Sequence, residues 1–171
     1  GEVLTSPLYI GMVFLSVVNE GRMPVPYLVE SIREPSGQLI TPDNRSSLDD
    51  LMRPETARAV REMMITTVER GSGQRAAVPG LLVGGKTGTA QVGGDLPPHA
   101  WFAGFAEAGE RGVVIVVMIE NGGEGSQTAA PIFAEVAQVA LSSYIDPGSE
   151  LLPRASATPV QEPSPTPAPT S

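Results

Sequence analysis

The first run of hydrophobic residues predicts a buried helix. Ser6 offers a hydroxyl that can cap a helix, and Pro7 suits the first turn because its missing N–H costs nothing there. The residues that follow, up to Val18, are apolar on almost every side, and Asn19-Glu20-Gly21 ends the run. A helix that is hydrophobic all round belongs inside a domain, so we expect this one to be buried.

Two further stretches have the helical period. One begins at Pro54 and ends at Gly71, and the other spans residues 129–144. The apolar stripe of the first consists of Ala57, Val60, Met64 and Val68. Both stretches alternate between an apolar and a polar face, which predicts helices that lie on the surface of a sheet or a core.

Three strand-like runs lie between these two helices, at residues 82–91, 100–107 and 113–119. The third run is apolar on both faces, which is typical of a central strand that is covered on two sides. A short hairpin is expected earlier, in which residues 27–32 turn at Pro35-Ser36-Gly37 into residues 38–40. Together these elements predict an α+β fold with an antiparallel sheet sandwiched by helices.

The composition changes near residue 147. Residues 147–171 are rich in Pro, Ser and Thr and have almost nothing to bury, so they predict a disordered, extended tail. A recognition peptide for a proline-binding partner is the alternative for this tail. Residues 1–146 are therefore expected to form the folded part. The chain does not begin with Met, which indicates a processed product or a piece of a longer polypeptide.

The overall composition argues against several classes of function. The formal net charge of −8 cannot supply the basic face that nucleic acid or anionic lipid requires. The chain has no cysteine, which excludes disulfides, thiolate chemistry and cysteine–zinc sites. The longest apolar run, residues 113–119, is too short to span a membrane.

Two polar positions invite a functional interpretation but do not support one. Asp49-Asp50 lies in a polar stretch with too few oxygen ligands to predict a metal site, and we expect no cofactor. His99 is the single histidine, and no carboxylate or nucleophile stands near it in the sequence. A structural role for His99 is therefore favoured over acid–base catalysis.

One position carries unusual chemistry, because Lys86 is the single lysine of the chain. It lies in the segment Gly-Leu-Leu-Val-Gly-Gly-Lys-Thr (residues 80–87), which matches the phosphate-binding pattern G-x-x-x-x-G-K-[ST]. That loop requires a strand before its first glycine and a helix that begins at the Lys-Thr pair. Here Pro79 precedes the first glycine, and a glycine-containing stretch follows Thr87. The context therefore disfavours a nucleotide site.

The alternative places this segment on a strand. Alternation then sends Lys86 and Gly88 to one face and Thr87 and Thr89 to the other, and twist near a sheet edge can bring all four to one cleft wall. A glycine within a strand indicates that another backbone or a ligand comes close. A compact cation beside hydroxyls suits an anionic or carbonyl-bearing ligand. A purely structural edge strand that is protected by its lysine stays open as an interpretation of these local residues.

Lys86-Thr87-Gly88-Thr89 resembles the K-T-G signature of the penicillin-recognising serine transpeptidases and β-lactamases. Further segments resemble a class B penicillin-binding protein in particular, and they occur in that family's order. They are residues 1–8, 78–91, 98–106 and 116–123, and Ala129-Ala130-Pro131. The resemblance covers about residues 1–144 and implies the C-terminal half of a transpeptidase domain, with the fold of that family.

The resemblance also implies roles for the motif residues. Lys86 would hold the serine of the family's S-x-N motif and supply positive potential, while Thr87 and Thr89 would offer hydroxyls to the substrate carboxylate. The N–H of Thr89 would contribute to the oxyanion hole. Gly88 would leave room for a substrate backbone along the strand. The implied reaction is D,D-transpeptidation of peptidoglycan stem peptides, which β-lactam antibiotics intercept.

Two motifs of the family are absent from this sequence. Val83 stands where S-x-x-K would need its serine, and none of the asparagines, Asn19, Asn44 and Asn121, has a serine two positions before it. We therefore expect the chain alone to be inactive and the upstream half of the same domain to supply the nucleophile and its base.

The resemblance finally implies a setting for the whole protein. It implies partners in the cell-wall synthesis machinery and a location on the extracytoplasmic side of a bacterial membrane, anchored through an N-terminal segment absent from this chain. A non-catalytic penicillin-recognising sensor or binding domain is the alternative function.

Overall fold

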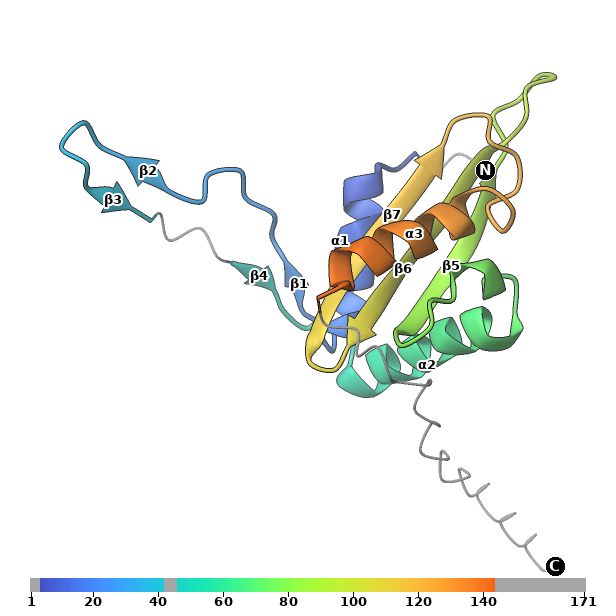
Figure 1. Ribbon diagram of the computed structural model, residues 1–171, viewed down its shortest axis with the longest axis horizontal. Helices are drawn as coiled ribbons and strands as arrows, with labels where there is room; N and C mark the ends of the chain where they lie inside the picture. Colours follow the sequence, from blue (N-terminus) through green and yellow to red (C-terminus); the bar gives the residue numbers. More distant parts are fainter. Residues whose placement is uncertain (1–3, 42–45, 144–171) are drawn as a thin grey trace, which may run out of the picture.

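The computed structural model describes residues 4–41 and 46–143, which contain three α-helices and a three-stranded sheet (Figure 1). The helices are α1 (Pro7–Val18), α2 (Pro54–Arg70) and α3 (Ala129–Leu141), and a short 3₁₀ helix, η1 (Gln74–Ala76), follows α2. The long strands are β5 (Leu82–Ala90), β6 (His99–Ala108) and β7 (Arg111–Ile119). The predicted tail at residues 147–171, and the boundary before it, lie outside the described residues.

The three long strands form one antiparallel sheet in the order β5-β6-β7. The prediction that residues 113–119 form the central strand is wrong, since β6 is in the middle and β7 is at one edge of the described sheet. The hydrophobic pattern nevertheless indicated two covered faces correctly. α1 packs on one face of β7 and α3 on the other (Figure 1).

The main core lies between the sheet and α3. Phe102 of β6 and Phe133 of α3 are fully buried, and their rings meet edge to face with centroids 4.8 Å apart. The small side chains of α3, Ala129, Ala130 and Ala137, are also fully buried and allow the helix to approach the strands closely. This packing holds α3, and the loop before it, against the middle strand.

α1 and α2 cover the opposite face of the sheet. Phe105 of β6 is buried on this side, and the guanidinium of Arg61 lies over its ring at 5.1 Å from the centroid. Arg61 also forms an ion pair with Glu107. The helices on both faces complete the sandwich and confirm the predicted α+β class.

α1 has the predicted bounds and cap, but it is not buried over its whole length. The hydroxyl of Ser6 accepts a hydrogen bond from the N–H of Tyr9 at 3.2 Å, as expected of an N-cap. Only Phe14, Ser16 and Val17 are buried, whereas Leu8 is 63% exposed and Tyr9 56% exposed. The prediction of a fully buried helix is therefore wrong for the described chain. This exposed apolar side is what we expect if the upstream half predicted from the sequence covers α1.

The chain produced by itself is expected to unfold at low temperature and over a broad range. Its α1 leaves apolar surface in water that the complete domain would bury, and this lost burial removes stabilisation of about 25 cal/mol for each Å². Circular dichroism during heating would measure the transition, with the chain fused to its upstream half as the control. A sharp transition of the chain alone at the temperature of the fused protein would contradict this expectation.

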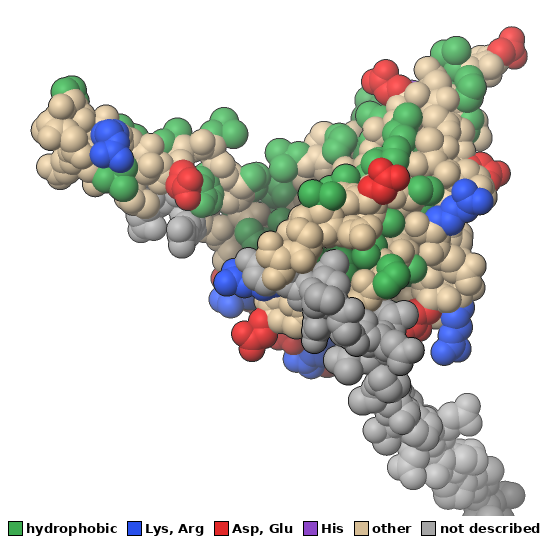
Figure 2. All heavy atoms as spheres, viewed as in Figure 1, with side chains coloured by type: hydrophobic (Ala, Val, Ile, Leu, Met, Phe, Trp, Pro, Cys, Tyr) green, Lys and Arg blue, Asp and Glu red, His purple; other side chains and the backbone are tan. Residues whose placement is uncertain are grey.

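An arm, residues 23–41 and 46–48, extends from one end of the sheet (Figure 1). It consists of two-residue strands in two pairs: β1 (Met23–Pro24) with β4 (Ser47–Leu48), and β2 (Ile32–Arg33) with β3 (Leu39–Ile40). The predicted turn is present, but the strand expected at 27–32 is reduced to its last residue, and the pairing of β1 with β4 was not predicted. Figure 2 shows hydrophobic side chains along the arm. Leu28 and Leu39 are exposed residues of this segment.

A small polar cluster lies at the base of this arm. Asp49 accepts hydrogen bonds from the hydroxyl of Ser47 at 2.9 Å and from Nε of Arg22 at 3.2 Å. These two donors, Ser47 first, lower the pKa of the Asp49 carboxyl below its usual value. The cluster is exposed, so it adds little stability.

Candidate active site

The four motif residues lie in the second half of β5, at one edge of the described sheet. β5 runs without interruption from Leu82 through Lys86 to Ala90, and it pairs with β6 over this whole length. A phosphate-binding loop would require a loop and the start of a helix at these positions. The strand interpretation is therefore confirmed, and the nucleotide site is excluded.

The register assigns the four motif residues to two faces of the sheet. Lys86 and Gly88 lie on the side that α1 and α2 cover, and Thr87 and Thr89 on the side that α3 covers. The predicted alternation is thus confirmed. Lys86 and Thr89 are exposed and Thr87 is half-buried, so all three side chains are accessible near the edge of the sheet.

The ammonium of Lys86 bends back toward Thr87. Its Nζ donates a hydrogen bond to the backbone carbonyl of Thr87 at 3.0 Å. Lys86 and Thr87 are therefore brought together although their side chains leave the strand on opposite faces. Thr89 lies on the same face as Thr87, about 7 Å further along the strand.

Ser72 is a polar neighbour of the motif that the sequence analysis missed. Its hydroxyl lies 2.9 Å from the hydroxyl of Thr87, and either oxygen can be the donor. Ser72 follows the last turn of α2, fifteen positions before Thr87. The only local signal was a hydroxyl residue directly after Gly71, the glycine that ends the helix.

The two glycines before Lys86 leave room for side chains of the core and not for a ligand. A Cβ on Gly84 would lie 2.4 Å from Cζ of Phe105, and one on Gly85 would lie 2.6 Å from Cζ of Phe102. Both rings are buried, on opposite faces of the sheet. Gly84-Gly85 therefore makes room for core aromatic side chains and not for substrate.

Gly88 is the glycine of the motif that another backbone does approach. A Cβ on Gly125, in the loop before α3, would lie 2.5 Å from the carbonyl oxygen of Gly88 and 2.1 Å from that of Trp101. Gly125 is buried, and its own carbonyl accepts hydrogen bonds from the first N–H groups of α3. The loop before α3 is thus packed directly on β5 at the motif.

His99 has a structural contact at the start of β6. Its Nδ1 accepts a hydrogen bond from the backbone N–H of Asn121 at 3.0 Å, and Asn121 has a positive φ of 53°. An acceptor at Nδ1 requires the proton of the neutral ring to be on Nε2. The contact ties the turn after β7 to the start of β6, in agreement with the structural role that was predicted.

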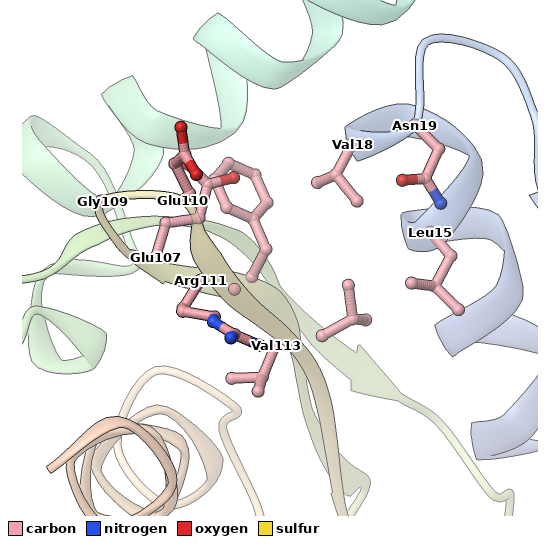
Figure 3. Close-up of a pocket in the computed structure, with 11 residues that line it drawn as sticks. Leu15, Val18, Asn19, Glu107, Gly109, Glu110, Arg111 and Val113 are labelled. Carbon is pink, nitrogen blue, oxygen red and sulfur yellow. The ribbon is translucent and has the colours of Figure 1, made fainter. Parts of the chain in front are cut away.

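A pocket at the other end of the sheet does not include the motif. It has a volume of about 370 Å³ and lies between the end of α1 and the β6–β7 turn. Figure 3 shows Leu15, Val18 and Asn19 on one side, facing Glu107 and Val113 across the gap. Lys86 and its neighbours instead lie at an open edge, where the described chain forms only one wall.

Neither a metal-binding cluster nor a membrane-spanning helix is found in the part of the chain that the structure describes. No three His, Asp or Glu side chains of these residues come together in a way that could hold a metal ion. Within the same residues, no helix has both the length and the hydrophobicity to cross a membrane.

A family model described as the penicillin binding protein transpeptidase domain matches residues 1–138. The chain is 30% identical over 152 residues to the peptidoglycan D,D-transpeptidase PbpA of Mycolicibacterium smegmatis, covering 86% of this chain and 31% of the relative. It is 33% identical over 148 residues to PbpA of Mycobacterium tuberculosis, covering 82% of this chain and 30% of the relative. The chain thus spans about a third of the length of the curated relatives it matches.

Solved structures give the same result for the fold. The penicillin-binding protein A of M. tuberculosis, solved as an imipenem acyl-enzyme complex, aligns with a TM-score of 0.72 and 34% identity over 82% of this chain and 32% of that chain. A D,D-transpeptidase domain of a peptidoglycan glycosyltransferase from Eggerthella lenta aligns with a TM-score of 0.72 and 32% identity over 81% of this chain and 32% of that chain. The described α+β sandwich is therefore similar to one part of these larger proteins.

Proposed function

The chain belongs to the transpeptidase domain family of the penicillin-binding proteins, and we propose that the protein containing it is a peptidoglycan D,D-transpeptidase that acts through a serine acyl-enzyme. The observation that carries the proposal is the Lys-Thr-Gly-Thr segment, which lies on an accessible edge strand. Its ammonium is hydrogen-bonded to the carbonyl of Thr87, and the hydroxyls of Thr87 and Thr89 lie on the opposite face of the strand. The relatives named D,D-transpeptidase support it.

The proposed reaction has two acyl-transfer steps. A serine hydroxyl attacks the carbonyl of the penultimate D-alanine, the peptide bond to the last D-alanine breaks, and free D-alanine leaves with the proton. The amine of a second stem peptide then attacks the ester, forms the cross-linking amide and releases the serine. We propose that the serine and its lysine base come from the upstream half of the domain, because this sequence holds neither S-x-x-K nor S-x-N.

The described residues fit the part of this reaction that concerns the substrate carboxylate. Thr87 and Thr89 share one face of β5 and can both direct hydroxyls toward one ligand lying along the strand. Lys86 adds a positive charge beside Thr87, in a chain whose net charge is −8. Among the described strands none pairs with the outer edge of β5, so a substrate backbone can add there as an extra strand.

Two further roles follow from the family. The N–H of Thr89 would be one donor of the oxyanion hole, where losing a donor typically costs about 3 kcal/mol in the barrier. Lys86 would also hold the serine of the upstream S-x-N motif. Both roles require the chain to be combined with its upstream half.

The proposal extends to ligands, partners and location. β-Lactams would acylate the same serine, as the structures of relatives with bound antibiotic support. The whole protein would work with the cell-wall synthesis machinery, on the extracytoplasmic side of a bacterial membrane, held by an N-terminal anchor. The alternative is a penicillin-recognising sensor, which would bind or be acylated but would form no cross-link.

Labelling with fluorescent penicillin tests the proposal. The full-length protein is expected to take up about one label per molecule, and the chain of residues 1–171 is expected to take up none because it lacks the nucleophile. Incubation of the full-length protein with a stem pentapeptide and an acceptor amine should then yield the cross-linked product and free D-alanine. Labelling without product would favour the sensor, and stoichiometric labelling of the chain alone would refute the assignment of the nucleophile.

A further inference from the structure

We propose that Ser72 is a positioning residue that orients the hydroxyl of Thr87 toward the ligand carboxylate. The inference rests on the proposed function, since it takes the ligand to carry the carboxylate of D-alanine or of a β-lactam. The observation behind it is the distance of 2.9 Å between Oγ of Ser72 and Oγ1 of Thr87. This contact joins the end of α2 to the motif strand.

The backbone on both sides of Ser72 is firmly held. The N–H groups of Gly71 and Gly73 both donate to the carbonyl of Thr67, each at 3.0 Å. Gly73 is packed so closely that a Cβ there would lie 3.3 Å from Cε2 of Phe102 and from Cγ2 of Val68. Ser72 is therefore fixed to the last turn of α2 and to the main core, although its own side chain is exposed.

The chemistry of the ligand decides the direction of the Ser72–Thr87 hydrogen bond. A threonine hydroxyl has a single proton to donate, and an ionised carboxylate can only accept. Thr87 must therefore donate its one hydrogen bond to the carboxylate, and its oxygen must accept a hydrogen bond from Ser72. Without a ligand either hydroxyl can donate. In the bound state Ser72 is the donor, and its hydrogen bond keeps the hydroxyl proton of Thr87 directed toward the carboxylate of the ligand.

Thr87 is held from its backbone as well. Nζ of Lys86 donates to the carbonyl oxygen of Thr87 at 3.0 Å, while Ser72 holds the side-chain oxygen. Thr89 lies on the same face but is exposed, and its side chain is about 7 Å away along the strand. The loss of Ser72 is therefore expected to act through Thr87.

The test compares acylation of the full-length protein by benzylpenicillin and by its methyl ester, which lacks the ionised carboxylate. Ser72→Ala is expected to lower the second-order rate constant for benzylpenicillin about tenfold, which corresponds to the loss of one hydrogen bond between neutral groups, here the bond that orients Thr87. The rate for the ester should stay the same within about twofold. Ser72→Thr restores a hydroxyl and should recover the rate for benzylpenicillin. Ser31→Ala removes an exposed serine of the arm and should leave both rates unchanged.

A double variant ties the effect to Thr87. Thr87→Val and Thr87→Val combined with Ser72→Ala should have the same rate, since Ser72 has no effect once its partner hydroxyl is gone. Equal losses with the acid and the ester, or no loss in Ser72→Ala, would overturn the role of Ser72 while leaving the transpeptidase proposal intact. A wild-type protein that is not acylated at all would refute the proposed function and this inference together.

Discussion

Replacing Lys86 by alanine in the full-length protein is expected to slow acylation by β-lactams on the order of 100- to 1,000-fold, the loss seen when one preorganised donor is removed from an acyl-transfer site. Lys86 is exposed, and its described contact is one hydrogen bond to the carbonyl of Thr87. Its removal therefore takes away the cation of the motif, at the carbonyl of Thr87, without opening the core. Stopped-flow acylation with a fluorescent penicillin measures the rate, and thermal unfolding checks the fold.

The matched control is Arg53→Ala, which removes one positive charge at an exposed position before α2. It should acylate at the wild-type rate, because exposed charges at a distance are screened by salt. An acylation rate of Lys86→Ala equal to that of Arg53→Ala would show that Lys86 is not part of the site. A melting temperature low enough for Lys86→Ala to be largely unfolded at the assay temperature would show that the lysine is structural.

Gly85→Ala is expected to destabilise the complete transpeptidase domain by about 1–3 kcal/mol or more, the usual cost of adding volume to a filled core. The new Cβ would lie 2.6 Å from Cζ of Phe102 and 2.7 Å from the carbonyl oxygen of Ala103. Phe102 is fully buried against Phe133 and the second obstacle is backbone, so neither can move aside easily. The shift in the midpoint of urea unfolding measures the loss.

Gly88→Ala provides the comparison within the same strand. Its nearest obstacle, Cβ of Trp101, would be 3.0 Å away and the next atom 3.7 Å away. The loss of stability should therefore be clearly smaller than for Gly85→Ala. If the two variants unfold at the same urea concentration, the tight packing at Gly85 is not the reason for the loss of stability.

Local signals in the sequence predicted the helices well. The N-cap hydroxyl of Ser6 and the prolines at the first turns of α1 and α2 place the starts of both helices correctly. These signals act between residues a few positions apart, so they can be read from the chain itself. The three long strands were also found, because each has enough residues for its pattern to be recognised.

The errors concern contacts that no local pattern contains. The hydrophobicity of β7 reports that both of its faces are covered, but it does not say which strands are its neighbours, so the central position was wrongly assigned. α1 has an apolar surface in every direction, and its sequence cannot tell whether the covering protein is in this chain. The strands of the arm have two residues each, too few to show an alternation.

The candidate site likewise contains features that local sequence signals predict and features that depend on distant contacts. The motif and its alternation were predictable from Lys86-Thr87-Gly88-Thr89 alone. The contact of Ser72 with Thr87 was not, because it depends on how the end of α2 packs against β5. The reason for Gly84-Gly85 could not be predicted either, since the two aromatic rings that require these glycines belong to another strand.

Those two rings also have a consequence for how the strands align during folding. The ring of Phe105 packs over Gly84 and the ring of Phe102 packs over Gly85, on opposite faces of the sheet. A slip of β5 by one residue would put the side chain of Val83 or Lys86 beneath one of the rings and would exchange the faces of every residue in the motif. The glycine pair therefore favours one register between β5 and β6. The packing of two buried rings on the glycines thus determines the face of the sheet on which Lys86, the single lysine of the chain, lies.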